Sequence, residues 1–389
     1  MQNAITTLRI QNFKSIKDVT MTPRRVNIII GEPNVGKSNI LEAMSLLGGM
    51  VYDQTPKFMA GMIRYEEPNQ LYYDNLSANT ICVESNHATS IIRAGRFPGT
   101  SQVLYVPASV VEALYNEQSR RMRVYRNSYD LWAEAFNEIL RTGKPGGNAL
   151  DGLNMKFGFR TVRIDGGMPD GELGFEKSSI GIEREVFVRP YLFHKNVAVG
   201  KDYGVKFLFP PNGTNLKNII QNYPALRKQV AEMFQYYKLK LSLRMVSAEL
   251  EVIKEVDDLV YSYPYSNTAD TLQRLIFYLA AIESNDDAVL LFEEPEAHSY
   301  PVYVSQLARR IVASRNNQFF VVTHSPYLIT EVLEEMMTND ELAPELAMFV
   351  TYYEDYQTKV RQLSDEEMRN IRRDGLDVFY NMARFVPQR

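Results

Sequence analysis

Apolar and polar positions alternate at the start of the chain in a way that predicts strands and one helix. Leu8 and Ile10 alternate with polar residues, and an apolar run at 26–30 is typical of a buried strand. A glycine-rich turn at 31–37 follows this run, and apolar residues then recur at helical spacing over 40–47. The pattern therefore predicts a buried strand, a tight turn and a helix in that order.

Apolar runs and helical periodicities alternate again in the last third of the chain. Two of the runs, at 288–292 and 319–322, are each followed by a proline that can begin a helix. Because strands alternate with helices at both ends of the chain, we expect an α/β fold built on a sheet. The other elements predicted here are a hairpin at 239–245 and 250–256, a helix at about 270–283, closing strands within 346–362 and a charged helix over 364–385.

The middle of the chain has a different character. Periodicity is helical over 109–141, whereas residues 142–215 are rich in glycine and proline and contain several turn signals. We therefore predict one fold formed by residues 1–106 and 236–389. Residues 107–235 are predicted to be an inserted subdomain of mixed helices and strands.

The loop between the first buried strand and its helix carries the strongest chemical signal. Gly31 to Ser38 reads G-x-x-x-x-G-K-S, a pattern in which backbone N–H groups surround phosphate oxygens. Lys37 is expected to reach the β- and γ-phosphates, Ser38 to bind Mg²⁺, and the helix to direct its positive end at the same anion. The residues predicted to bind the nucleotide are Asn34, Val35, Gly36, Lys37, Ser38 and Asn39.

Two later strands end in side chains that suit phosphate hydrolysis. One leads into Glu293, predicted to hold Mg²⁺, and Glu294, predicted to polarise the attacking water as a general base. An acidic loop that caps the next helix is the alternative interpretation. The other strand leads into His324, which we expect at the γ-phosphate because strand C-termini in open parallel sheets face the ligand crevice. A structural or capping histidine is the alternative. Lys37, Glu294 and His324 are thus the predicted catalytic residues.

In this order the motifs resemble those of ATP-binding-cassette (ABC) ATPases, and more closely the RecF- and SMC-like branch that includes the OLD (overcoming lysogenization defect) family. Segment 8–16 is similar to that branch's N-terminal strand pair, and 31–39 to its Walker A motif. Segment 293–298 is similar to its extended Walker B motif, and 323–326 to its switch-histidine loop. The resemblance implies a P-loop, ABC-like ATPase fold that takes ATP and Mg²⁺.

Two positions depart from the family pattern, one in the Walker B motif and one in the signature. The usual Walker B aspartate is Glu293 here, one methylene longer. The family's Ser-x-Gly signature approaches the γ-phosphate bound to a partner subunit, and Asp270 stands at its glycine position. An aspartate there suits a helix N-cap but repels phosphate unless it is turned away or screened. The resemblance implies only a signature-like role for Thr268, Asp270 and Thr271. Gln102 lies in the region where the family's Q-loop glutamine is expected.

Composition narrows the functional classes. Cys82 is the only cysteine, which excludes an intrachain disulfide and a multi-cysteine metal site. The sequence shows no secretory leader and no apolar segment near the roughly 20 residues that span a membrane, so we expect a cytoplasmic protein without a membrane partner. A net charge of −4 does not indicate nucleic-acid binding, although four arginines within 120–126 leave a local basic patch open.

The resemblance also implies partners. Proteins of this branch place ATP between subunits, so we expect a homodimer or a larger homo-oligomer. Stand-alone ATPases of this kind often control a separate effector in bacterial anti-phage defence, and the chain carries neither an Asp-x-Asp nuclease motif after His324 nor a long heptad run. Two other functions stay open. One is a DNA-clamping ATPase of repair or chromosome maintenance, and the other is a nucleotide-gated scaffold with little hydrolysis.

Overall fold

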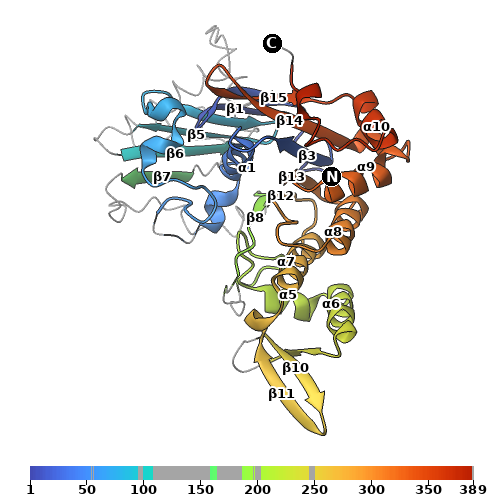
Figure 1. Cartoon of the computed structure of the whole chain (residues 1–389). Helices are drawn as coiled ribbons and strands as arrows, with labels where there is room; N and C mark the ends of the chain where they lie inside the picture. Colours follow the sequence, from blue (N-terminus) through green and yellow to red (C-terminus); the bar gives the residue numbers. More distant parts are fainter. Residues whose placement is uncertain are drawn as a thin grey trace.

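The computed structural model shows an α/β protein with two large sheets and a projecting hairpin (Figure 1). In the part of the chain that it describes, the strands form two six-stranded sheets and one three-stranded sheet. The arginines at 120–126 and most of the predicted insertion lie outside that part. The described residues are 1–53, 55, 57–94, 100–107, 158–163, 186–195, 197, 203–244 and 250–387.

A mainly parallel sheet holds the strands to which the sequence assigns chemistry. Its order is β15-β14-β3-β13-β12-β8, and only the β14–β15 pair is antiparallel. The strand of the phosphate loop therefore lies two places from the strand that ends at Glu293. Its members are β3 (Val26–Gly31), β8 (Val188–Tyr191), β12 (Val289–Glu293), β13 (Gln318–Val322), β14 (Leu346–Glu354) and β15 (Gln357–Gln362).

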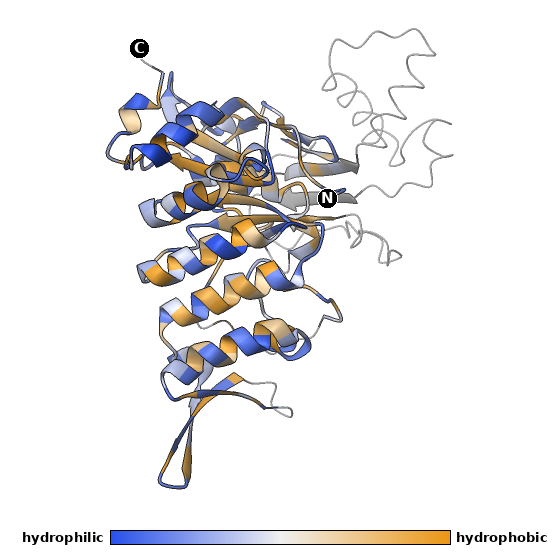
Figure 2. Ribbon diagram, turned by 90° about the vertical axis from the view of Figure 1, so that its right-hand side faces the viewer, coloured by the Kyte–Doolittle hydropathy of each residue, from blue (hydrophilic) through white to orange (hydrophobic). Residues whose placement is uncertain are grey.

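Alternate residues of these strands enter two separate apolar cores. Ile28 and Ile30 face the core that contains most of the helices, whereas Ile29 faces the core beneath helix α1 (Lys37–Ser45). Both faces of the sheet are covered, which explains why its strands read as continuous apolar runs. The helices of the first core contact one another in sequence and form the stack seen in Figure 2. They are α6 (Pro224–Tyr236), α7 (Asp270–Ser284), α8 (Pro301–Ala313), α9 (Pro326–Met337) and α10 (Asp365–Arg373).

The second large sheet is antiparallel and packs on the other side of α1. Its order is β2-β1-β4-β5-β6-β7, and its inner residues share an apolar core with α1 and one face of the parallel sheet. Short 3-10 helices follow α1 and connect it to this sheet: η1 (Gly49–Tyr52), η2 (Pro68–Leu71) and η3 (Tyr73–Asn75). The strands are β1 (Leu8–Phe13), β2 (Ile16–Met21), β4 (Ile81–Ser85), β5 (Ala88–Ala94), β6 (Thr100–Pro107) and β7 (Gly158–Arg163).

A smaller lobe extends from the helix stack and ends in a hairpin (Figure 1). Helix α5 (Leu216–Asn222) and α6 pack against α7, and a three-stranded antiparallel sheet follows them. The hairpin leads through η4 (Tyr265–Asn267) directly into α7. The strands of this sheet are β9 (Lys240–Leu243), β10 (Leu250–Val256) and β11 (Leu259–Pro264).

The sequence predicts most of these elements, with one clear error. The predicted α/β class, the buried strands and the hairpin of β9 and β10 are confirmed, whereas β11 was not predicted. The predicted final helix over 364–385 is wrong beyond Arg373. It ends because Gly375 adopts a left-handed conformation (φ 58°), and a short 3-10 helix, η6 (Met382–Arg384), follows later.

The interval 107–235 contributes to the main fold as well as to the smaller lobe. β8, which falls inside this interval, pairs with β12 in the parallel sheet. The division of the chain into three domain segments stays a prediction. One more 3-10 helix, η5 (Ala343–Glu345), precedes β14. Among the described helices, none combines the length and apolar character that crossing a membrane requires.

Candidate active site

The loop between β3 and α1 has a conformation that only glycine tolerates at two points. Gly36 has φ 91°, and a Cβ atom there would overlap the hydroxyls of Thr358 and Ser15. A Cβ atom at Gly31 would overlap the carbonyl oxygen of Thr351. Asn34 also lies in the left-handed region, at φ 61°. The backbone is therefore curled as the G-x-x-x-x-G-K-S pattern requires.

A chain of hydrogen bonds links this loop to Ser15 and to β15. The Asn39 amide donates to Ser15 Oγ (2.7 Å), the Ser15 and Thr358 hydroxyls bond each other (2.6 Å), and Thr358 Oγ1 donates to the carbonyl of Val35 (2.9 Å). Thr358 is completely buried. Neither Ser15 nor Thr358 was predicted as a site residue. No sequence signal identifies Thr358, because it lies on β15, more than 300 residues after the loop.

Lys37 lies folded onto its own loop. Its ammonium donates to the carbonyls of Gly31 (3.0 Å) and Glu32 (2.6 Å) and is buried. Burial lowers the pKa of Lys37, and the nearby charge of Glu294 opposes this effect. Lys37 donates only to neutral carbonyls in this loop, so an anionic phosphate would be a better partner for it. The glycine cradle and the buried ammonium therefore fit a nucleotide phosphate.

Mg²⁺ fits the site only together with such a nucleotide. Within the described residues, no group of three or more His, Cys, Asp or Glu side chains is placed to hold a metal ion. Mg²⁺ is commonly held by one or two protein oxygens, with substrate phosphates and water completing its octahedron. The hydroxyl of Ser38, at the start of α1, and the carboxylate of Glu293, at the end of β12, are the groups that would hold it.

The ends of β12 and β13 place a carboxylate beside an imidazole. Glu294 has a left-handed backbone (φ 42°), and its N–H donates to the Val322 carbonyl of the neighbouring strand (2.8 Å). Its Oε1 lies 3.7 Å from Nε2 of His324. A glutamate held in this backbone region is the kind of local strain that clusters at functional sites.

The electrostatics link these two side chains to the phosphate loop. Burial lowers the pKa of His324, the charge of Lys37 lowers it further, and Glu294 opposes both. The histidine is therefore neutral at neutral pH. The predicted catalytic residues Lys37, Glu294 and His324 thus act on one another electrostatically at a common edge of the parallel sheet.

Glu296 ties the loops after β12 and β13 together and was not predicted as a site residue. Its Oε1 accepts hydrogen bonds from the Thr323 hydroxyl (2.6 Å) and the His324 N–H (2.9 Å). The carboxyl is buried, and its Oε2 has no hydrogen-bond partner. Burial raises the pKa of Glu296, against the lowering effect of those hydrogen bonds. This glutamate therefore fixes the backbone that carries His324.

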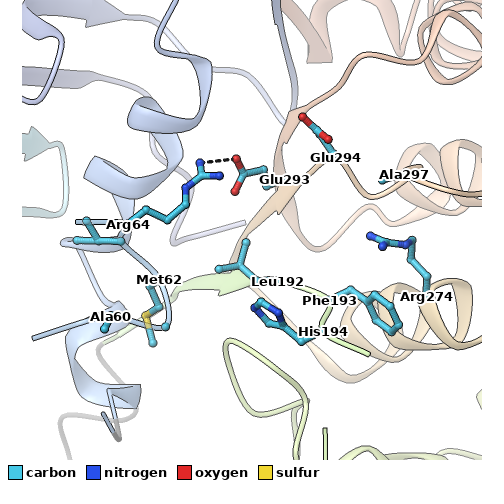
Figure 3. Close-up of a pocket in the computed structure, with 12 residues that line it drawn as sticks. Ala60, Met62, Arg64, Leu192, Phe193, His194, Arg274, Glu293, Glu294 and Ala297 are labelled. Atoms are coloured by element: carbon cyan, nitrogen blue, oxygen red, sulfur yellow. Dashed lines mark hydrogen bonds and ion pairs between the residues drawn. The ribbon is translucent and has the colours of Figure 1, made fainter. Parts of the chain in front are cut away.

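Arg64 is a further site residue that the sequence did not identify. Its Nη2 donates to Glu293 Oε1 (2.8 Å; Figure 3), and its Nε donates to Glu42 Oε1 on α1 (2.8 Å). Arg64 follows the 3-10 segment after α1, in a region with no recognisable motif. Its place beside α1 is set by its hydrogen bonds to Glu42.

The pocket drawn in Figure 3 opens beside Glu293 and Glu294 and has a volume of about 320 Å³. His194 lines it, because β8 lies next to β12 and the chain leaves β8 at Tyr191. Gln102, in contrast, lies on β6 of the antiparallel sheet, opposite Arg93 and Thr161. Gln102 thus lies in a different sheet from β12, and its place in a Q-loop stays a prediction.

The signature-like segment differs in one detail from the prediction. Ala269 is the N-cap of α7, and Asp270 is the first helical residue. Asp270 pairs with Arg274 one turn later (3.6 Å), so its charge is screened. The Thr271 hydroxyl donates to the carbonyl of His298 (2.9 Å), which links α7 to the loop after β12. The N–H of Thr268 donates to the Tyr265 carbonyl (2.9 Å).

Two family models match parts of the chain. Residues 4–91 match the AAA ATPase domain, and residues 191–330 match the model described as AAA domain, putative AbiEii toxin, Type IV TA system. The first match contains the phosphate loop, and the second contains Glu293, Glu294 and His324. Both segments are therefore similar to ATPase domains of the AAA type. No curated protein matches the chain.

Several solved structures resemble the fold weakly. One is the Smc head domain with an extended coiled coil bound to the C-terminal domain of ScpA, derived from Pyrococcus furiosus. It is 15% identical with a TM-score of 0.44, covering 95% of this chain and 98% of that chain. Another is the SMC head domain from Thermotoga maritima, which is 12% identical with a TM-score of 0.37, covering 92% and 99%. At these TM-scores the likeness carries no conclusion about function.

Proposed function

We propose that this protein binds Mg·ATP at the loop 31–39 and hydrolyses it. In this proposal Lys37 neutralises the β- and γ-phosphates, and Ser38 and Glu293 hold the Mg²⁺. Glu294 takes the proton of the attacking water, and His324 donates a hydrogen bond to the γ-phosphate. Mg²⁺, when bound, withdraws charge from the β- and γ-phosphate oxygens. One observation carries the proposal: Glu294 Oε1 lies 3.7 Å from His324 Nε2, and both side chains interact electrostatically with Lys37.

We propose further that two copies close over the nucleotide. The side chains of Glu294 and His324 keep 47% and 40% of their surface exposed, which leaves the reacting region open to bulk water. Hydrolysis sites generally exclude such water when they close. In this arrangement, the start of α7 in the second copy faces the γ-phosphate. The pairing of Asp270 with Arg274 supports this role, because it screens the negative charge of Asp270 from the phosphate.

The conformational change on hydrolysis is proposed to act on a separate effector. The hairpin of β10 and β11 supports this, because every residue of β11 is exposed and the strand leads through η4 into α7. Its apolar side chains Leu259, Val260 and Tyr261 are of the kind that mark protein interfaces. The role in bacterial anti-phage defence rests on the family resemblance of the motifs.

Turnover and binding measurements on three proteins test the ATPase proposal. The wild type is expected to hydrolyse ATP, Glu294→Gln to bind ATP with little hydrolysis, and Lys37→Ala to do neither. A fluorescent ATP analogue measures binding separately from turnover. Equal, near-zero rates for the wild type and Glu294→Gln with binding retained would support the scaffold function instead.

The DNA-clamp alternative is tested in the same assay. Duplex DNA should then raise the ATP turnover in a salt-sensitive way, because phosphate contacts release counterions. The arginines that the sequence offers for this role, Arg121 and Arg123, lie outside the described residues. Replacing both with glutamine should abolish the stimulation if they contact DNA. Turnover that does not respond to duplex DNA removes this alternative.

Co-purification of a second protein, identified by native mass, would support effector control.

A further inference from the structure

Arg64 bridges the two halves of the candidate active site. One side of its guanidinium bonds Glu42, which lies on α1 one turn after Ser38. The other side bonds Glu293 at the end of β12 (Figure 3). A single cation therefore links the helix of the phosphate loop to the carboxylate that the proposed function assigns to Mg²⁺.

The backbone of Arg64 is anchored beside α1, whereas most of its side chain is exposed to solvent. The Lys14 ammonium donates to the Arg64 carbonyl (2.6 Å) and pairs with Glu42, and the Arg64 N–H donates weakly to Glu42 (3.4 Å). Glu42 itself is buried with these partners, as a buried carboxylate requires. In contrast, the side chain of Arg64 is 66% exposed. Movement of the guanidinium therefore need not disturb the buried cluster.

The bond between Arg64 and Glu293 conflicts with metal binding. A guanidinium and a divalent cation repel each other when both are bound to the same carboxylate. We propose that Arg64 is a latch: in the nucleotide-free protein it occupies Glu293 in place of Mg²⁺, and arrival of Mg²⁺ with nucleotide displaces it. This inference rests on the proposed function, because it requires that Glu293 holds Mg²⁺.

The neighbouring pocket gives the displaced side chain somewhere to go. Arg64 lines the cavity of about 320 Å³, together with His194, Leu192 and Met62. The guanidinium can leave Glu293 and enter this space while its Nε keeps the bond to Glu42. Opening the latch then costs one ion pair that is partly exposed to water. Such a pair weakens the apparent affinity for a competing ion by about two- to sixfold.

The test is the Mg²⁺ concentration that gives half-maximal binding of a fluorescent, non-hydrolysable ATP analogue. Arg64→Gln is expected to lower this concentration about two- to sixfold relative to the wild type. Arg64→Lys should lower it less, because one ammonium cannot bond Glu42 and Glu293 in the fork that a guanidinium provides. The lysine variant also keeps a cation beside Glu42, so it serves if the glutamine variant folds poorly.

Arg9→Gln is the matched control, because Arg9 also pairs with a partly exposed carboxylate, Asp18, but lies on β1 outside the candidate site. Its half-saturating Mg²⁺ concentration should equal that of the wild type. An unchanged or raised value in both Arg64 variants overturns the latch, as does an equal decrease in the Arg9 control. If the wild type binds the analogue without any dependence on Mg²⁺, the assignment of Mg²⁺ to Glu293 fails and the latch with it. A failure in the Arg64 variants or in the control overturns the latch but leaves the proposed function intact.

Discussion

Replacement of Glu296 tests whether one buried carboxylate holds His324, the histidine of the proposed catalytic site, in place. Glu296→Ala removes the acceptor of two hydrogen bonds, one from the Thr323 hydroxyl and one from the His324 N–H. An unsatisfied buried donor costs about 1–3 kcal/mol. Water can partly satisfy the His324 N–H, since that residue is half exposed, so we expect a total loss of about 2–4 kcal/mol in the free energy of unfolding.

The matched variant is Glu296→Gln, which keeps an oxygen at the position that accepts both bonds. Its amide NH₂ replaces Oε2, an atom that has no hydrogen-bond partner. The added cost is thus limited to one unsatisfied amide, about 1 kcal/mol. Guanidinium chloride unfolding of the three proteins measures these differences. The ATP turnover of Glu296→Ala should also fall, because the backbone of His324 is no longer held, whereas Glu296→Gln should keep most of it.

The pH dependence provides an independent check. Burial raises the pKa of Glu296 in the folded protein, so the folded state binds this proton more tightly than the unfolded state does. The resulting stability is fully present below the unfolded pKa and is lost as pH rises through the raised folded pKa. The wild type should therefore lose stability relative to Glu296→Gln between about pH 4 and neutral pH. A constant difference across this range, or equal unfolding of the Ala and Gln variants, refutes the reasoning.

Three further predictions follow from the phosphate loop and its neighbours. Lys37→Ala should abolish binding of a fluorescent ATP analogue, and tight binding in that variant contradicts the loop assignment. Thr358→Val deletes the hydrogen bond to the Val35 carbonyl and should cost about 1–2 kcal/mol in stability and weaken ATP binding. Thr358→Ser keeps the hydroxyl and should bind like the wild type. Because the pKa of His324 is lowered, hydrolysis should stay constant as pH falls through 6.5. It should decrease only below that pH, where a protonated His324 beside Glu294 makes this carboxylate a weaker base. A decrease that begins above 6.5 contradicts a neutral His324, as does a profile unchanged in His324→Gln.

The elements of the fold were predictable where the chain carries a strong local pattern. The buried strands β3, β12 and β13 are continuous apolar runs, and the helices after β12 and β13 begin at prolines. The final helix was predicted too long because the sequence after Arg373 still contains helix-forming residues. A single glycine in the left-handed region ends the helix there.

The candidate site was also predictable only where the sequence carries a local pattern. The phosphate loop needs a turn, a lysine and a hydroxyl within eight residues, so its chemistry is legible in the sequence. The carboxylates after β12 and the histidine after β13 were predictable because residues that follow parallel strands meet at one edge of the sheet. Position along the chain does not reveal which strand lies beside β12, so the pairing of β8 with it was not predicted.

The sequence by itself therefore determined which side chains carry the proposed chemistry: a loop suited to phosphate, acids suited to a metal and a water molecule, and a histidine. Only the tertiary structure decided which residues support that chemistry. Arg64, Glu296 and Thr358 contact the site from segments that are distant in the sequence or lack a motif. Their roles depend on the order of strands in the sheet and on side-chain packing between elements. Such contacts are set by the folded arrangement of the whole chain and leave no signature in the local pattern of residues.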